Sequence, residues 1–309
     1  MSRTLYSLML VTLLPVGAQA QVSLKYDPDL KSGQVIRTEI DIDTNQTLTI
    51  AGMPLETGNS MFLVTRETVG EATPQGGHVL QGEFEILQSD MSLPGGITFN
   101  FNSNNPNRPL SGELEELIGE FFQKMVVAKW KLTTGADHKV VSAEYLGEPF
   151  ANVSEYFKSD ADPKLLMTRT NTDLARYPSD PVNVGGTWTR SEDFEAGGGQ
   201  TIELERKFNL LGSEVRDGRT FDKVGMTALS VKLVVADNPA QPVKVTQSDL
   251  KIADSEGTLW YDRAAKQFTE GRDKVHITGT LTVEVQGMKL PGELDLTIET
   301  KSKSKVIEP

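Results

Sequence analysis

The chain has 309 residues, a formal net charge of −12 at pH 7 and no cysteine. Proteins that bind a nucleic-acid backbone draw most of their affinity from clustered lysine and arginine, so the acidic balance argues against such a partner. The lack of cysteine excludes disulfides, a cysteine nucleophile and a lipid attached at a cysteine. The length suits one large domain or two ordinary ones.

The first twenty residues have the pattern of a secretory signal peptide. Arg3 precedes an apolar run at residues 5–16, and Ala18-Gln19-Ala20 places small residues before a cleavage site. The run is too short to span a bilayer, and a retained membrane anchor is the alternative. We expect cleavage after Ala20, export to the periplasm or the extracellular space, and no transmembrane segment in the mature chain.

Alternation of apolar and charged residues predicts a mainly β protein. In residues 35–43, isoleucine and threonine occupy one set of positions and charged side chains the other, as in a half-buried strand. Clusters of Gly, Pro and Asn separate the segments and mark turns. Further strands are expected at residues 47–50, 61–68, 79–87, 97–101, 201–211, 219–224, 228–235 and 242–252, followed by a final hairpin of 274–285 with 293–302.

Two internal similarities predict a repeated architecture. Residues 31–39 and 184–192 share a pattern of glycine, apolar residue, arginine, hydroxyl and glutamate, and residues 47–55 and 280–290 share Thr-Leu-Thr followed by Gly-Met-x-Leu. We therefore expect two related antiparallel, curved-sheet (half-barrel-like) halves. The expected division is a first half at 21–149, a helical connection at 150–177, with helices at 150–157 and 163–174, and a second half at 178–309.

One amphipathic helix is expected at residues 112–126. Its apolar stripe consists of Leu114, Leu117, Ile118, Phe121, Phe122 and Met125, and acidic residues stand near its amino end. In a β-rich protein this stripe would pack on the concave face of a curved sheet. A stripe of this kind covers either a filled core or a ligand cavity, and the sequence leaves both open.

Three tryptophans join this helix as candidate ligand-binding residues. Trp130 and Trp260 each precede a polar turn in a predicted hairpin, and Trp188 follows the repeated glycine pattern. Ordinary core packing is the alternative for each residue taken singly. The full candidate set is Leu117, Phe121, Phe122, Met125, Trp130, Trp188 and Trp260.

Patterns that carry catalytic or metal chemistry are missing. His78, His138 and His276 have no second ligand at metal-binding spacing, and no Gly-x-Ser-x-Gly nucleophile motif occurs. We therefore expect no metal, no other cofactor and no enzymatic activity; a hydrolase that acts through two carboxylates is the less favoured alternative. The alternating Lys301, Lys303 and Lys305 are interpreted as charges that protect an exposed sheet edge.

The segment Tyr177-Pro178-Ser179-Asp180-Pro181-Val182-Asn183-Val184-Gly185-Gly186-Thr187-Trp188, with the turn Phe101-Asn102-Ser103, resembles a family of exported bacterial proteins of unknown function. More remotely, and in architecture only, the expected fold is similar to the curved-sheet periplasmic carriers of lipoproteins. These resemblances favour a non-enzymatic envelope protein that binds an apolar ligand or a protein partner between sheet and helix. The alternative is a structural or interaction protein with a filled core and no ligand.

Overall fold

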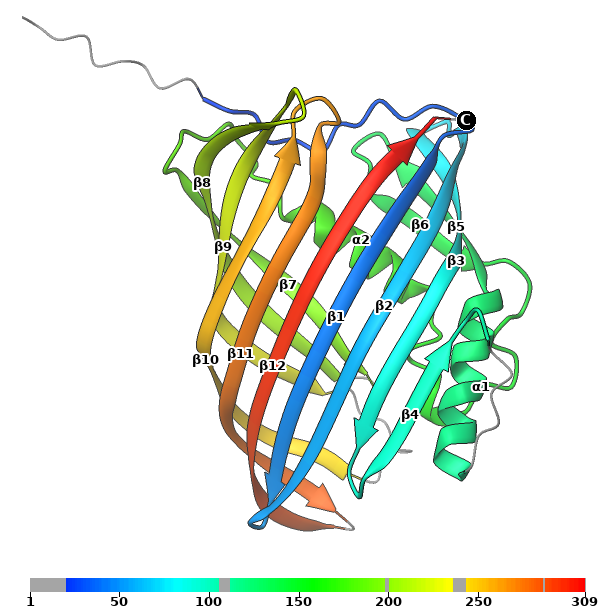
Figure 1. Cartoon of the computed structure of the whole chain (residues 1–309), viewed down its shortest axis with the longest axis vertical. Coiled ribbons are helices and arrows are strands. Elements are labelled where there is room, and N and C mark those ends of the chain that lie inside the picture. Colours follow the sequence, from blue (N-terminus) through cyan, green and yellow to red (C-terminus); the bar gives the residue numbers. More distant parts are fainter. Residues whose placement is uncertain (1–20, 106–111, 198–199, 236–242, 286, 309) are drawn as a thin grey trace, which may run out of the picture.

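The computed structural model describes residues 21–105, 112–197, 200–235, 243–285 and 287–308. In this part of the chain, twelve strands form one antiparallel sheet in the order β6-β5-β3-β2-β1-β12-β11-β10-β9-β8-β7, with β4 paired to β3. The sheet is curved and unclosed (Figure 1). The expected mainly β class is therefore confirmed.

Most strands are long. The first side of the sheet contains β1 (Val35–Ile50), β2 (Met53–Ala72), β3 (Gly76–Leu93), β4 (Ile97–Asn102), β5 (Lys129–Gly135) and β6 (Val140–Tyr145). The second side contains β7 (Thr187–Gly197), β8 (Gln200–Arg216), β9 (Arg219–Val235), β10 (Val243–Asp262), β11 (Gln267–Val285) and β12 (Met288–Ile307). The helices are α1 (Glu113–Val127), α2 (Lys164–Ala175) and the 3₁₀ turn η1 (Glu155–Phe157).

The first and last strands join the two sides of the sheet. β1 pairs with β12 along its whole length, from Val35 opposite Ile307 to Ile50 opposite Gly292. The polar residues between the two segments predicted at 35–43 and 47–50 do not interrupt β1, because β2 and β12 pair with it on both sides. The two similar stretches of sequence thus contribute to one continuous sheet.

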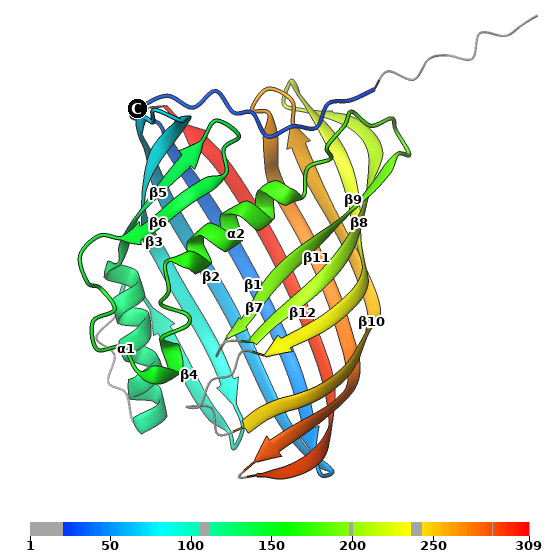
Figure 2. The same ribbon diagram turned by 180° about the vertical axis from the view of Figure 1, so that it is seen from behind.

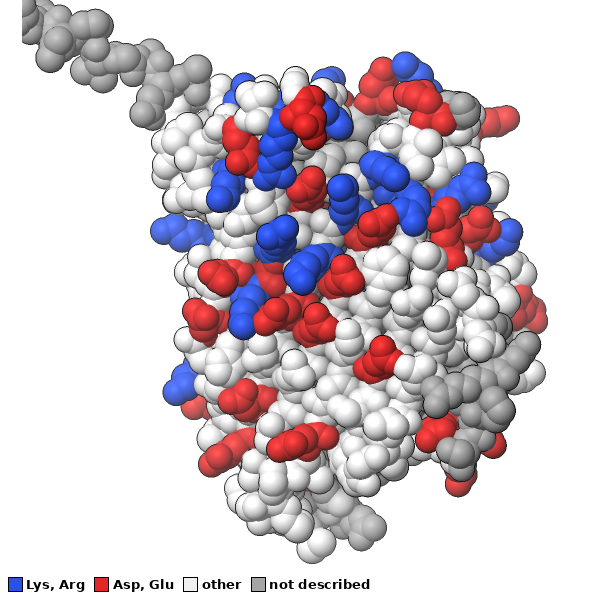
Figure 3. Space-filling view, viewed as in Figure 1, with Lys and Arg blue, Asp and Glu red and all other residues white. Residues whose placement is uncertain are grey.

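The alternation predicted for β1 separates two faces. Ile36 and Ile42 pack in buried apolar clusters on the concave face. Glu39 and Asp41 lie on the opposite, convex face, in register with Lys303 and Lys301 of β12. The convex face accordingly carries charges of both signs (Figure 3).

The interpretation of the alternating lysines as edge protection is wrong. β12 lies in the middle of the sheet, between β1 and β11. Lys303 stands opposite Glu39 on one side and Glu270 on the other. The lysines therefore alternate because the convex face is charged, and opposite charges across strands stabilise their pairing.

The connection between the halves is less helical than the sequence predicts. Of residues 150–157, only η1 is helical, and Asn152 takes a left-handed conformation with φ of 57°, which ends any helical path before it. The second helix is as expected, and Asp162 Oδ1 accepts a hydrogen bond of 2.9 Å from the backbone N–H of Lys164, the first residue of α2.

Both helices lie on the inner side of the curved sheet (Figure 2). α1 packs over β3 and β4 at one side, through Phe122 against Leu87 and Phe99. α2 lies between the two edge strands, in contact with β6 and with β7. The expected amphipathic helix on a concave face is confirmed, and α2 crosses the open side as a second inner element.

The two ends of the sheet differ. At the upper end, where the C-terminus lies in Figure 1, residues 21–30 cross the sheet. Val22 forms a β-bridge with Val182, Leu24 is buried beside β8 and β9, and Leu30 packs beside β5. At the lower end lie the β1–β2 and β11–β12 turns, and a hydrogen bond of 3.2 Å joins Ala51 N of the first turn to Pro291 O of β12.

The two copies of the glycine pattern differ by one residue between their alignment in sequence and their alignment in structure. The glycines with positive φ are Gly33 and Gly185, whereas the similarity of letters aligns Gly33 with Gly186. Side chains alternate between faces, so a shift of one residue reverses them. Glu39 therefore lies on the convex face, and its counterpart Glu192 is buried on the concave side.

Candidate ligand-binding site

The lower half of the concave face is lined by aliphatic side chains. They stand in rows across neighbouring strands: Leu48 is in register with Leu294, and Leu296 with Ile277. The buried members of this cluster are Ile202, Leu204, Ala228, Val275, Ile277, Leu281, Val283, Leu294, Leu296 and Ile298. Together with the half-buried residues that pack against them, the rows form one continuous apolar surface over six strands, β1 and β8 to β12.

Part of this surface is not covered by protein. Ile42, Leu48 and Ile50 on β1, with Leu250 and Ile252 on β10, pack against the buried cluster yet stay half-buried. Aliphatic side chains that face the inside of a curved sheet and keep contact with solvent are typical of an apolar binding surface. We call this set the lower apolar lining.

The predicted helix residues lie at one side of this lining. Phe122 stacks on Phe99, with ring centroids 5.7 Å apart, and Met125 packs against the same cluster. Phe121 stacks on Phe157 at 4.3 Å. Leu117 is half-buried on the same helix. The two phenylalanines fasten α1 and the η1 turn to the sheet.

The three predicted tryptophans do not come together. Trp130 of β5 lies in the upper core, and its Nε1–H donates to Glu67 Oε1 at 3.2 Å. Trp188 lies in the other upper cluster, stacked on Phe208 at 5.5 Å. Trp260 lies on the opposite face from its neighbours Leu259 and Tyr261, beneath the Arg216 guanidinium at 4.9 Å. None of the three belongs to the lower apolar lining.

Helix α2 is fastened to both edges of the open sheet. On one side, the Asn171 amide bonds to the backbone N–H and C=O of Val140, at 2.9 and 3.0 Å, in the manner of a pairing strand. On the other side, Trp188 Nε1–H donates to the Arg176 carbonyl at 2.8 Å. The helix thus spans the gap between β6 and β7.

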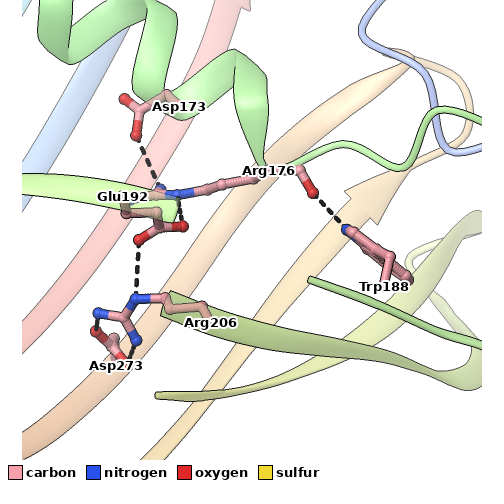
Figure 4. Close-up of polar contacts among 6 residues, drawn as sticks. All are labelled: Asp173, Arg176, Trp188, Glu192, Arg206 and Asp273. Atoms are coloured by element: carbon pink, nitrogen blue, oxygen red, sulfur yellow. Dashed lines mark hydrogen bonds and ion pairs between the residues drawn. The ribbon is translucent and has the colours of Figure 1, made fainter. Parts of the chain in front are cut away.

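A chain of ion pairs extends from α2 across the concave face (Figure 4). Arg176 lies 2.9 Å from Asp173 and 2.9 Å from Glu192 of β7. Glu192 Oε2 lies 2.8 Å from Arg206 Nε of β8, an ion pair whose angle does not make a hydrogen bond. Arg206 in turn forms two hydrogen bonds with Asp273 of β11, at 3.0 and 2.6 Å. We call these five residues the inner ion chain.

The electrostatics of the ion chain fit its position inside the curved sheet. Burial raises the pKa of Asp173, an effect that Arg176 partly offsets, although 65% of this side chain is exposed. The raised pKa and the exposed side chain agree if solvent reaches the Asp173 carboxylate inside a concave surface that protein surrounds. Burial opposes the charged form of Arg176, but Asp173 and Glu192 outweigh it and raise the pKa of the guanidinium.

Sequence reasoning missed the inner ion chain, although one strand carried a signal. In β8 the buried positions Ile202, Leu204, Phe208 and Leu210 alternate, and Arg206 occupies the same set with 6% of its side chain exposed. A charged residue at a core position of a strand requires a buried partner. The identity of that partner depends on the fold, because Asp273 is 67 residues away.

A separate pocket lies at the upper end of the molecule. It has a volume of about 600 Å³, and its lining includes Lys25, Arg263 and Lys266. Two of these cations are already paired, Arg263 with Asp222 at 2.7 Å and Lys266 with Asp27 at 3.3 Å. The pocket is therefore a weaker candidate than the lower apolar lining.

Metal and membrane features were sought in the same part of the chain. Among the described residues, no three histidine, aspartate or glutamate side chains gather in a way that could hold a metal ion. Neither helix there combines the length and apolar character needed to cross a membrane.

Comparisons with known proteins show weak structural likenesses. No family model matches the chain, and no curated protein matches it. A structure of lipovitellin, described in terms of lipid–protein interactions, has a TM-score of 0.43 and 11% identity over 91% of this chain and 26% of that one, so this chain spans about a quarter of its length.

Two bacterial structures also match. A DUF1329 family protein from Desulfovibrio piger has a TM-score of 0.17 and 8% identity, over 86% of this chain and 84% of that one. A putative outer membrane lipoprotein-sorting protein domain from Vibrio parahaemolyticus has a TM-score of 0.17 and 10% identity, over 85% and 83%. The second, a lipoprotein-sorting domain, agrees with the remote architectural resemblance to lipoprotein carriers, and neither likeness carries an argument about function.

Proposed function

We propose that this protein is an exported, non-enzymatic binding protein of the cell envelope that holds an apolar ligand, such as the acyl chains of a lipid. The ligand lies on the lower apolar lining, between the sheet and the two inner helices. The observation that carries the proposal is the set of half-buried aliphatic side chains on the concave face, exemplified by Leu48, Ile50 and Leu250. Covering them with acyl chains removes apolar surface from water.

A polar band above the lining supports an amphiphilic ligand. Thr38 donates a hydrogen bond to Ser304 at 3.2 Å on the concave face, and the inner ion chain lies on the facing strands. The exposed carboxylate of Asp173 offers acceptors for a hydroxyl or amine group. A lipid would place its chains below this band and its polar group beside it.

Export and the absence of catalysis belong to the same proposal. The predicted signal peptide lies outside the described residues, and the segment that would begin the mature chain is packed in the fold from Val22 onward. A two-carboxylate hydrolase needs acids free to act in one cleft. In the inner ion chain, Glu192 and Asp273 are both held by Arg206, which supports a structural role for these acids.

Native mass spectrometry of protein purified from its own host tests the proposal. We expect a mature chain that begins at Gln21 and retains lipid-sized mass. Leu48→Glu, which places a charge on the lining, should lose this mass. Val215→Glu should keep it, because Val215 is 71% exposed at the upper end of the molecule. A bare mature chain would instead favour a scaffold with a filled core, and a protein-sized addition would favour a protein partner.

A further inference from the structure

Two similar turns form the lower tip of the sheet. Gly52-Met53-Pro54-Leu55 follows β1, and Gly287-Met288-Lys289-Leu290 follows β11. Ile50 is in register with Gly292, so the β1–β2 turn lies beside Pro291 and Gly292 of β12, and the β11–β12 turn extends four residues further. We call residues 51–55 and 287–292 the lower tip.

The lower tip exposes large apolar side chains. Met53 is 66% exposed and Met288 is 60% exposed, and Leu55 is also exposed. Aliphatic residues elsewhere on the same strands are buried, among them Leu281 and Leu294. Large apolar side chains exposed at one end of an acidic protein are typical of a surface that contacts a partner or a membrane.

The charge of the lower tip differs from that of the rest of the molecule. The chain as a whole has a formal net charge of −12, whereas Lys289 is the one charged residue of the tip. The nearest carboxylates in the sequence, Glu56 and Glu293, begin where the tip ends. On the convex face, charges gather in the upper and middle parts and thin out toward the lower end (Figure 3). Glu284 stands in register with Lys289, so the tip is a nearly uncharged end of an acidic molecule.

The exposed residues of the tip continue the lower apolar lining. Met53 is in register with Ile50, and Leu55 with Leu48. On the other turn, Met288 is in register with Val285, and Leu290 with Val283. Residues in register share a face of the sheet. An acyl chain could therefore pass from the tip to the lining without leaving an apolar surface.

We propose that the lower tip docks on the surface of a lipid bilayer, with Met53 and Met288 in the interfacial region and Lys289 beside anionic head groups. This inference rests on the proposed function, since the bilayer would be the donor or acceptor of the apolar ligand. Methionine side chains are flexible and apolar, and they adapt to an irregular partner such as a lipid interface.

Vesicle flotation of the full mature chain tests this inference. The vesicles contain phosphatidylethanolamine with phosphatidylglycerol, and a second set contains phosphatidylcholine alone. We expect the wild-type protein to float with the first set and less with the second. Met53→Asp combined with Met288→Asp should reduce the vesicle-bound fraction about tenfold or more, because two apolar anchors are replaced by charges. Val215→Asp, equally exposed at the other end, should float as the wild type does.

Three outcomes would overturn the inference. The first is that the wild-type protein does not float, and the second is that the double aspartate variant floats as well as Val215→Asp. The third is that the wild-type protein does not float but elutes as a dimer on size-exclusion chromatography, while the double variant elutes as a monomer. This result would make the tip an interface between copies of the chain. If the aspartate variant does not fold, Met53→Ser with Met288→Ser gives the same test.

The docking inference and the binding proposal can fail separately. When a fatty acid is supplied in solution without vesicles, native mass spectrometry of the double variant should still show its bound mass, because Leu48 and Leu250 of the lining are unchanged. Loss of flotation with retained lipid supports docking at the tip. Loss of retained lipid in Leu48→Glu with intact flotation identifies the lining as the binding surface and the tip as the docking surface.

Discussion

The upper and lower ends of the concave face are built from the same strands and are filled in different ways. At the upper end, Leu24 and Leu30 from the crossing segment, with Trp130 and Trp188, complete two cores. At the lower end, aliphatic side chains stay half-buried and the turns expose methionine. The inner ion chain lies between the two. The upper end is therefore closed by packed side chains, whereas the lower end leaves apolar side chains partly exposed, and this is where we propose that a ligand binds.

The largest effect is expected from breaking the inner ion chain. Arg206→Met leaves the buried Glu192 and the partly buried Asp273 without their shared guanidinium. Removal of one partner from a buried ion pair should lower the free energy of unfolding by about 3–5 kcal/mol. Urea denaturation measures this change in the free energy of unfolding. Lys232→Met, which breaks an exposed pair with Glu203, is the control and should change little. Equal stabilities of the two variants would contradict a structural role for the chain.

The next effect separates the two ends directly. Leu210→Ala removes a fully buried side chain of the upper core and should cost about 2–5 kcal/mol. Leu48→Ala, on the lower apolar lining, should cost about 1 kcal/mol, because this side chain is only half-buried in the absence of ligand. Thermal unfolding of the delipidated variants compares the two losses of stability. Similar costs would mean that the lower end is packed as tightly as the upper end.

A glycine in the upper core gives a smaller effect. A Cβ at Gly82 would lie 2.1 Å from Trp130 Nε1 on the neighbouring strand, so Gly82→Ala must displace the indole from Glu67. Overpacking of this kind should cost about 1–3 kcal/mol. The control Gly112→Ala, where no atom lies within 4 Å of the added Cβ, should cost less than about 1 kcal/mol. Tryptophan fluorescence during urea denaturation measures the stability of both variants.

The smallest effect is a pH dependence at Glu67. Burial raises the pKa of its carboxyl above 4.5, and the hydrogen bond from Trp130 offsets this only in part. The folded protein therefore holds this proton more tightly than the unfolded chain. The resulting stability is present below pH 4.5 and is lost as the pH rises through the folded pKa.

Glu67→Gln keeps an acceptor for Trp130 and removes this titration. Compared with the wild type, the variant should gain free energy of unfolding as the pH rises from 4 to 8, in urea denaturation at a series of pH values. Glu83→Gln, on a more exposed pair with Lys129, is the matched control and should not show the gain. A constant difference between Glu67→Gln and wild type at all pH values would contradict the burial of this carboxyl.

Local patterns in the sequence predicted the faces of the strands well. The alternation along residues 35–43 correctly separates Ile36 and Ile42 from Glu39 and Asp41. The apolar stripe of the helix predicted at 112–126 correctly indicates that Phe121 and Phe122 are buried. Both patterns depend on short-range periodicity, which a sequence displays directly.

Features that depend on distant partners could not be predicted in this way. The same alternation describes an edge strand and a central strand, so the position of β12 follows only from its pairing with β1. The repeated pattern aligns Glu192 with Glu39, but a shift of one residue places the two side chains on opposite faces of the sheet. Trp130 and Trp260 have similar local settings, but Trp260 lies on the convex face of the sheet and Trp130 is buried on the concave face. Their role in binding stays a prediction.

Photo-crosslinking tests the central claim most directly. A fatty acid with a diazirine near the end of its chain is bound to the mature protein and irradiated, and the labelled peptides are mapped by mass spectrometry. The account predicts labels on the lower concave face, at β1 near Leu48 and Ile50 and at β10 near Leu250, which unlabelled fatty acid should displace. Labels on the convex face around Trp260, or labels that a competitor does not displace, would contradict it.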